Sequence, residues 1–279
     1  MSLLSSILLG LIQGLAEFLP ISSSGHLAIA EHFLGQAGIP ATPDFFDVLL
    51  HLGTLVAVFV AYWQDIREMV VELIDGIRDL AHGTTPNPIP PARRLILLII
   101  VATLPLFAVL PVKDLVEALS GNIYFVAGAL IVTGFLLFAS DRGKKGRKTE
   151  KNATLVDVLL VGVAQAIATC PGISRSGTTI TAGCFVGFDR KFAVRFSFLM
   201  SIPAILGANL LTMIDAIQEN TIIVSDIPVY LVGVAVAAVV GYACIRLLKM
   251  IADKGKFGWF AYYCWTAGLI VLALTLVVG

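Results

Sequence analysis

Charged residues are scarce in this chain. Only 14% of its 279 residues are Asp, Glu, Lys or Arg, whereas 58% are hydrophobic, and the mean hydropathy is +0.92. Ordinary soluble domains carry about 25% charged residues, so the composition excludes that class of protein. The sequence predicts an all-α polytopic membrane protein that forms a single integral membrane domain over residues 1–279.

Cysteine is also rare, with four residues and no CxxC spacing. Because all four lie in or beside apolar segments, we expect packed thiols instead of a disulfide framework or a zinc site. No basic residue precedes the apolar N-terminal stretch, and Gln13 and Glu17 interrupt it. This differs from a signal peptide, and we expect the segment to remain in the mature protein.

A short polar motif occurs twice, at residues 13–26 and again, 152 positions later, at residues 165–178. The positions identical in the two copies and their flanks are Gly10/Gly162, Gln13/Gln165, Ala16/Ala168, Ile21/Ile173, Ser22/Ser174, Ser24/Ser176 and Gly25/Gly177. The identities gather at a polar break and not in the apolar flanks, which indicates an internal repeat. The reactive groups differ, because the first copy has Glu17 and His26 and the second has Arg175.

Six stretches are long and apolar enough to cross a bilayer, which takes about 20 residues. They lie near 46–63, 95–112, 123–140, 192–214, 228–248 and 259–278. The two motifs lie elsewhere. The segments 3–19 and 155–170 break at 20–25 and 171–177, and only short apolar arms follow. Each motif is therefore predicted to form a re-entrant helix-loop-helix hairpin, whose irregular backbone must be buried in protein or line a wet cavity.

The basic residues support this layout. With the N-terminus outside and both hairpins re-entrant, 17 of the 19 Lys and Arg residues fall in cytoplasmic loops, as the positive-inside rule requires. Each half, 1–140 and 153–279, then has one hairpin and three spans, joined by the basic cytoplasmic loop 141–152. An odd number of spans inverts the second half, so an inverted-topology repeat with both termini outside is predicted. Residues 64–79 are predicted to form an amphipathic helix on the cytoplasmic surface.

Glu17 is the leading functional candidate, because an ionisable group at membrane depth is costly and faces a cavity or a partner. It shares a helix face with Gln13, four residues earlier. His26 in the same hairpin could act as a base, since imidazole titrates near neutrality. Asp47 and His51 form a second pair, for which a functional and a structural role are equally compatible with the sequence.

The serine-glycine clusters are suited to an anion, because hydroxyls and amides meet there at a helix N-terminus. They could equally serve as plain helix caps. Arg175 favours the anion, since a guanidinium binds phosphate bidentately. The residues expected to bind substrate are Gln13, Ser22, Ser24, Gly25, Ser174, Ser176, Gly177 and Thr178. A lipid diphosphate held with Mg²⁺ fits this set, with Glu17 and the diphosphate supplying metal ligands.

Two stretches at the hairpin tips resemble a known family. Residues 17–26 (EFLPISSSGH) and 171–177 (PGISRSG), together with 46–54 (FDVLLHLGT), are similar to signature stretches of the undecaprenyl-diphosphatase family of the bacitracin-resistance type. The resemblance covers essentially the whole chain. It implies an inner-membrane enzyme of bacteria that hydrolyses undecaprenyl diphosphate, depends on Mg²⁺ or Ca²⁺, and recycles the lipid carrier for the cell wall.

The resemblance also implies roles for single residues. By this resemblance, Glu17 is the essential acidic residue, and His26 and Ser23 are candidate catalytic residues. Arg175 is the residue that clamps the diphosphate. Many family members have a glutamate where this chain has Gln13. Metal binding by Glu17 and Gln13 together would therefore use an amide oxygen at position 13 in place of a carboxylate. The expected partners are a polyprenyl diphosphate and membrane lipids, with no nucleic acid, and a homodimer is compatible with the sequence.

Several alternatives stay open at this stage. His26 could activate water, or Ser23 could attack first and form a phosphoenzyme. A polyprenyl-phosphate flippase or transporter could use the same midplane anion site, and a structural membrane subunit would leave the polar tips unexplained.

Overall fold

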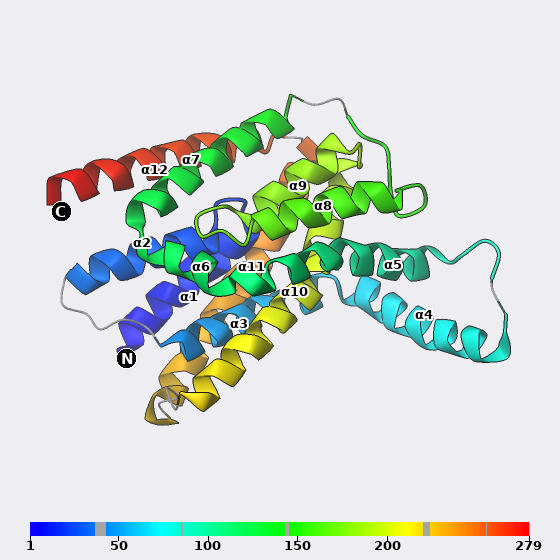
Figure 1. Ribbon diagram of the computed structural model, residues 1–279, viewed down its shortest axis with the longest axis horizontal. Helices are drawn as coiled ribbons and strands as arrows, with labels where there is room; N and C mark the ends of the chain where they lie inside the picture. Colours follow the sequence, from blue (N-terminus) through cyan, green and yellow to red (C-terminus); the bar gives the residue numbers. More distant parts are fainter. Residues whose placement is uncertain (37–42, 85, 143–144, 220–223, 255, 279) are drawn as a thin grey trace.

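The chain folds into a bundle of helices, seen in a computed structural model that describes residues 1–36, 43–84, 86–142, 145–219, 224–254 and 256–278 (Figure 1). The helices of the first half are α1 (Leu3–Phe18), α2 (Ser23–Gln36), α3 (Asp44–Ala61), α4 (Trp63–His82), α5 (Pro91–Thr103), η1 (Leu104–Ala108), η2 (Leu110–Val112), α6 (Lys113–Ala118), η3 (Leu119–Gly121) and α7 (Ile123–Ser140). The second half has α8 (Leu155–Ile167), α9 (Arg175–Phe185), α10 (Arg190–Gln218), η4 (Val224–Asp226), α11 (Ile227–Lys254) and α12 (Gly258–Val278). Among the described residues no strand is present, only an isolated bridge between Lys148 and Phe188, so the all-α class is confirmed.

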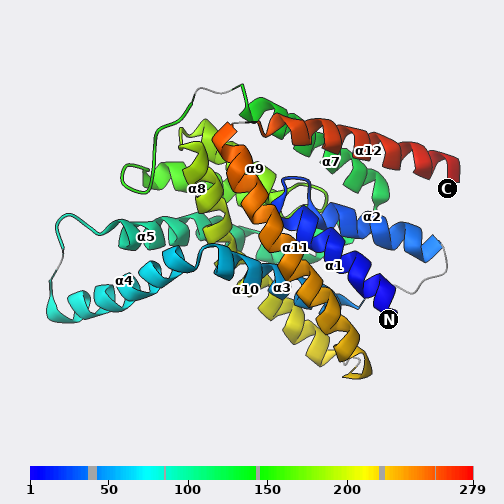
Figure 2. The ribbon, with the colours of Figure 1, turned by 180° about the vertical axis from the view of Figure 1, so that it is seen from behind.

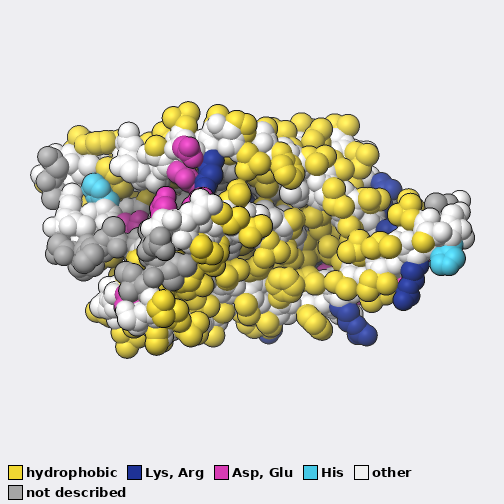
Figure 3. All heavy atoms as spheres, turned by 60° about the horizontal axis from the view of Figure 1, so that its bottom comes forward, with side chains coloured by type: hydrophobic (Ala, Val, Ile, Leu, Met, Phe, Trp, Pro, Cys, Tyr) yellow, Lys and Arg dark blue, Asp and Glu magenta, His cyan; other side chains and the backbone are white. Residues whose placement is uncertain are grey.

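The membrane character of the protein is confirmed. Five helical segments of the described chain are long and apolar enough to span a bilayer, or six if α3 and α4 count as one bent span. Figure 3 shows one face covered largely by hydrophobic side chains, with most of the visible Lys and Arg toward one end of the long axis. A surface of this kind suits contact with lipid.

Each motif forms two helices joined by a break, and none of these helices is counted as a full membrane span. The apolar helices α1 and α8 are too short to be counted among the spans, and the second arms α2 and α9 have 14 and 11 residues. Both second arms begin earlier than expected, at Ser23 and Arg175, because Ser22 and Ser174 cap them. The order hairpin, then spans, recurs in both halves. The inversion between the halves 1–140 and 153–279 stays a prediction, and residues 143 and 144 of the joining loop lie outside the described residues.

The span expected near 95–112 is not one continuous α-helix. The α-helical part, α5, ends at Thr103, and the chain continues as the 3₁₀ helices η1 and η2. Pro105 and Pro111 lie at the starts of these two helices, where a missing N–H removes an α-helical hydrogen bond. The sequence showed both prolines, but hydropathy alone does not distinguish an interrupted span from a regular one.

Helix α4 leaves α3 at an angle of 84°. None of its residues is buried, and aliphatic side chains such as Leu73 and Ile77 are exposed. Arg93 at the start of α5 binds its other face, 3.2 Å from Glu72 and 2.7 Å from Asp79. The guanidinium of Arg93 lowers the pKa of the Asp79 carboxyl through this hydrogen bond. The expected amphipathic helix is therefore present, and its position on a membrane surface stays a prediction.

The first arm of each hairpin packs on a helix of the other half. Helix α1 lies along α11, as both ribbon views show, and α8 lies against α5 (Figures 1 and 2). The repeated glycines make these approaches possible. A Cβ atom on Gly10 would be 2.5 Å from the Gly233 carbonyl oxygen of α11, and one on Gly162 would meet the Ala102 carbonyl of α5.

Gly10→Ala is expected to lower the thermal unfolding midpoint of the purified protein, because its methyl group meets backbone that cannot rotate away. Overpacking of this kind costs about 1–3 kcal/mol. Gly128→Ala in α7 is the matched control, since no atom of the described residues lies within 4 Å of its added Cβ. Equal midpoints for the two variants would contradict the close packing of α1 on α11.

Candidate active site

The two hairpin tips touch each other, as the sequence predicted. The Gly172 amide donates to Ser24 Oγ at 3.5 Å. A Cβ atom on Gly25 would lie 2.9 Å from Gly172 Cα, and one on Gly177 would lie 3.2 Å from Cβ of Pro20. Residues about 150 positions apart therefore form one polar centre within an otherwise apolar bundle.

The repeated serines cap the second arms in the same way. The Gly25 amide donates to Ser22 Oγ at 3.2 Å, and the Gly177 amide donates to Ser174 Oγ at 3.1 Å. Ser22 is buried and has a φ of 74°, a left-handed conformation that is uncommon outside glycine and often marks functional sites. The capping alternative is thus present in the structure, and substrate binding by Ser22 and Ser174 stays a prediction.

Thr133 of α7 fixes the second tip. Its hydroxyl donates to the Gly172 carbonyl at 3.2 Å and accepts from the Ser174 amide at 3.0 Å. The side chain is fully buried. The tip that presents Arg175 is therefore held by a spanning helix, and its backbone is preorganised.

Glu17 is the centre of the site, although only 7% of it is exposed. Its Oε2 accepts from Ser23 Oγ at 2.6 Å and from Gln13 Nε2 at 3.2 Å. Its Oε1 accepts from Arg175 Nη2. A buried carboxylate needs such a set of donors, and the four residues come from both hairpins.

Arg175 still has donor capacity. Its Nη1 is buried and has no hydrogen-bond partner among the described residues, although Nη2 is held by Glu17. A guanidinium offers five N–H donors in a planar fork that matches phosphate oxygens. The predicted clamp residue therefore lies at the contact of the two tips with part of its fork unused.

His26 lies near the first tip, but its hydrogen bonds lead away from Glu17. Its Nδ1 is 2.7 Å from the Ser22 carbonyl, which can only accept, so Nδ1 carries the proton. Its Nε2 is then the acceptor and receives the Tyr263 hydroxyl at 2.8 Å, with the two rings stacked. In this arrangement, the basic nitrogen of His26 is engaged by α12.

The imidazole found beside Glu17 is that of His51, whose Nε2 lies 3.9 Å from Glu17 Oε2. Its Nδ1 is 2.8 Å from the Asp47 carbonyl of the preceding turn, which fixes the ring. The spacing of Asp47 and His51 marked them in the sequence, but nothing there placed His51 beside Glu17. Tyr263 carried no signal at all, because it lies in an ordinary apolar span.

Two more of the expected substrate-binding groups are buried polar atoms without a partner. Gln13 Oε1 and Thr178 Oγ1 have no hydrogen-bond partner in the described part of the chain. Both residues are largely inaccessible. Ser176 is also buried, and its hydroxyl lies 3.4 Å from that of Ser174. Unpartnered buried acceptors are costly unless a ligand or water pairs with them.

The donor set can be compared with the needs of a divalent cation. The described residues contain no group of three or more His, Cys, Asp or Glu side chains suited to a metal. Glu17 and the unpartnered Oε1 of Gln13 nevertheless offer two hard oxygen atoms. Mg²⁺ is commonly held by one or two carboxylates together with substrate phosphates. The residues present thus fit a metal that arrives with a phosphorylated substrate.

The four cysteines, all in the described part of the chain, form no disulfide. Cys244 and Cys264 are buried in the apolar core. These two are packed thiols as expected, whereas Cys170 and Cys184 are only partly buried.

Comparison with known proteins identifies relatives over nearly the full length. Residues 6–270 match the family model described as bacitracin resistance protein BacA. The chain is 41% identical to undecaprenyl-diphosphatase of Syntrophotalea carbinolica, covering 99% of this chain and all of the relative. It is 40% identical to undecaprenyl-diphosphatase of Alkaliphilus metalliredigens, with 99% and 100% covered, and 38% identical to that of Methanosphaera stadtmanae, with 99% of each chain covered. The paired hairpin tips thus lie in a chain that belongs to the bacitracin resistance protein BacA family.

Proposed function

We propose that this protein hydrolyses undecaprenyl diphosphate to undecaprenyl phosphate and inorganic phosphate. This reaction recycles the lipid carrier for cell-wall synthesis and gives resistance to bacitracin. The observation that carries the proposal is the pair of the buried Glu17 and the partly buried Arg175, one from each hairpin, beside Ser23. A soluble substrate would not need such a site within the membrane, whereas a lipid diphosphate would.

Arg175 binds and orients the diphosphate in this proposal. Without substrate its Nη2 pairs with Glu17, and its unpartnered Nη1 is available for a phosphate oxygen. Phosphoryl transfer relies mainly on positioning and on stabilisation of charge that spreads over the phosphoryl oxygens. The fork of Arg175 supplies both, and the buried surroundings strengthen the interaction.

Glu17 and Gln13 are the residues that would hold Mg²⁺ or Ca²⁺. The bound cation would neutralise charge on the diphosphate and on the transferred group. Gln13 offers its Oε1, which has no partner in the described structure, and Glu17 offers its carboxylate. Because a metal-bound Glu17 needs Arg175 less, the guanidinium could then turn to the phosphate.

The hydrogen bonds favour Ser23 as the nucleophile. Its hydroxyl already donates to Glu17 at 2.6 Å, so Glu17 can take the proton as Oγ attacks the terminal phosphorus. Undecaprenyl phosphate leaves, and water then releases phosphate from Ser23. In the other route His26 activates water directly, which requires its Nε2 to leave Tyr263. Trapping phosphoserine at position 23 would select the first route.

We further propose that the protein lies in the inner membrane of a bacterial cell, with both termini outside. The chain is a multi-pass membrane protein, and its basic residues gather in loops that this orientation places in the cytoplasm. The polyprenyl substrate enters from the lipid phase toward the contact of the two tips.

Removal of divalent metal is expected to reduce phosphate release by at least about a hundredfold, consistent with the loss of charge neutralisation at the site. The assay is phosphate release from undecaprenyl diphosphate by the purified protein in detergent, before and after EDTA, with restoration by Mg²⁺ or Ca²⁺. Full activity in EDTA would contradict the metal assignment. Lipid binding without any phosphate release, over a range of metals and pH, would contradict the enzyme and direct attention to lipid translocation.

A further inference from the structure

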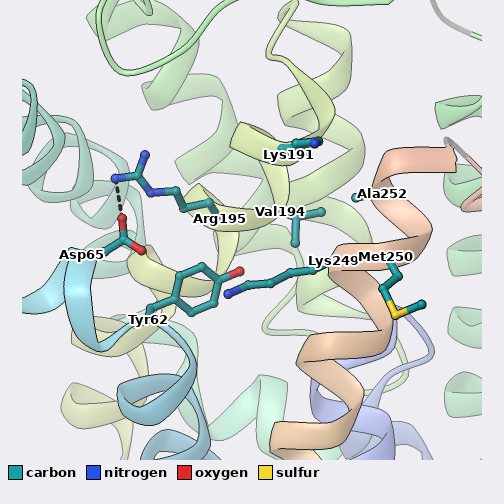
Figure 4. Close-up of a pocket in the computed structure, with 8 residues that line it drawn as sticks. All are labelled: Tyr62, Asp65, Lys191, Val194, Arg195, Lys249, Met250 and Ala252. Carbon is teal, nitrogen blue, oxygen red and sulfur yellow. Dashed lines mark ion pairs between the residues drawn. The ribbon is translucent and has the colours of Figure 1, made fainter.

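A second polar crevice lies at the corner where α3 turns into α4. It has a volume of about 500 Å³ and is bounded by the first turns of α10 and the last turns of α11 (Figure 4). Tyr62 and Asp65 line it from the corner, Lys191 and Arg195 from α10, and Lys249 from α11. None of these residues belongs to the candidate active site.

Among the described residues that line this crevice, basic side chains outnumber acidic ones. Lys191, Arg195 and Lys249 line it together with one carboxylate, that of Asp65. Arg195 is held 2.5 Å from Asp65, which Figure 4 marks, and 3.6 Å from Glu150. Arg195 is thus compensated by two carboxylates, and the cation that favours an anion in this crevice is Lys249.

Lys249 is held in a partly desolvated position. Its Nζ donates to the Ala61 carbonyl at 3.0 Å and lies 3.6 Å from the centre of the Tyr62 ring. No carboxylate within ion-pair distance of its ammonium group is found among the described residues. A partly buried cation without a countercharge gains strongly from a bound anion.

Two buried donors of the crevice have no partner. The Tyr62 hydroxyl and Arg195 Nε make no hydrogen bond within the described chain, and Tyr62 is only 3% exposed. Figure 4 shows the Tyr62 hydroxyl directed toward Lys249 and the α11 side of the crevice. A buried hydroxyl without a partner beside the ammonium group of Lys249 is a point where a ligand oxygen can bind.

A wall of aromatic rings separates this crevice from the active site. Phe18, the residue after Glu17, packs edge-on against Phe198 at 5.4 Å between ring centres. Phe198 in turn packs against Tyr62 at 6.1 Å. Since Phe18 and Phe198 are fully buried, an anion in the crevice could not reach Arg175 through this wall.

We propose that the crevice is a second anion site that takes the phosphate group of an anionic membrane lipid. Lys249, Lys191 and the Tyr62 hydroxyl would bind the phosphate. Met250 adjoins the crevice and is 63% exposed on the spanning helix α11, where acyl chains would lie. A free phosphate ion shares the chemistry of the lipid headgroup, but it has no acyl chain to contact the exposed Met250 beside the crevice. The proposal does not depend on the diphosphatase activity.

The test is the retention of phosphatidylglycerol by the intact protein, measured by native mass spectrometry after titration in detergent. The double variant Lys191→Gln/Lys249→Gln is compared with wild type and with Lys151→Gln, an exposed lysine outside the crevice. We expect affinity for one phosphatidylglycerol to fall about tenfold or more in the double variant only, because two charge-assisted contacts are lost. Phosphatidylcholine, which carries no net charge, should show no such difference.

Asp65→Asn provides a second variant with the opposite expectation. Removing this carboxylate raises the positive charge of the crevice, so phosphatidylglycerol should bind several-fold more tightly. Displacement of the lipid by inorganic phosphate at millimolar concentration would show that the site recognises the phosphate group alone. No displacement would show that binding also requires the rest of the lipid. Unchanged lipid affinity in both variants, with no effect of inorganic phosphate on thermal stability, would overturn the proposal. Phosphate release at saturating substrate should be unchanged throughout, which separates this site from the catalytic one.

Discussion

Glu17→Gln is expected to lower the kcat for phosphate release by about a thousandfold. The amide keeps the size of the side chain but can neither take the Ser23 proton nor serve as a charged metal ligand, and a single positioned base contributes about 10²–10⁴-fold. The kinetics of the purified variant on undecaprenyl diphosphate provide the measurement. Because the substituted amide still has an oxygen that can accept from Arg175, we expect the fold to survive, and thermal unfolding checks this.

Glu117→Gln is the control for this substitution, since that carboxylate is exposed and pairs only loosely with Lys113 at 3.6 Å. Its activity should equal that of wild type. A Glu17→Gln enzyme that retains more than a tenth of wild-type activity would show that neither proton transfer nor metal binding depends on this carboxylate.

Arg175→Lys is expected to lose about a hundredfold in kcat/KM, and Arg175→Gln about a thousandfold or more. Lysine keeps the charge but not the planar fork, so it cannot hold two phosphate oxygens together. Glutamine removes the charge that stabilises the transferred phosphoryl group, an effect of about 10³–10⁵ in related chemistry. Steady-state kinetics that report kcat and KM separately distinguish lost binding from lost transition-state stabilisation.

The control for the arginine series is Arg78→Gln, whose side chain is 71% exposed on α4. The double variant Glu17→Gln/Arg175→Gln adds a further criterion. Residues that act as one unit are not additive, so the double variant should be little worse than the poorer single variant. Fully additive losses would argue that Glu17 and Arg175 act in separate places.

The hairpins were predictable because their signal is local and occurs twice. Breaks at Pro20 and Pro171, flanked by apolar segments too short to span, identify the hairpins without any tertiary information. The meeting of their tips followed from the repeat, and contacts such as that between Gly172 and Ser24 confirm it. The starts of α2 and α9 were each placed three residues late, since serine caps extend the helices backward from the glycines.

The partners of the imidazoles could not be predicted. His26 meets Tyr263 across 237 positions of sequence, and no spacing rule relates a hairpin residue to one face of a distant span. His51 reaches Glu17 because α3 packs beside α1 at that level. Such contacts depend on how whole helices are rotated and placed, which apolar sequences specify only weakly.

The packing of α1 on α11 has a consequence for how the protein is made. Helix α1 leaves the ribosome long before its principal partner α11, which begins at Ile227, more than 200 residues later. The tip that carries Glu17 lacks Arg175 until α9 is made, and α1 lacks the backbone surface that Gly10 contacts until α11 is made. The first hairpin must therefore wait in the translocon or at the membrane surface while most of the chain is synthesised. Any truncation before α11 should leave a nascent product that quality-control proteases degrade.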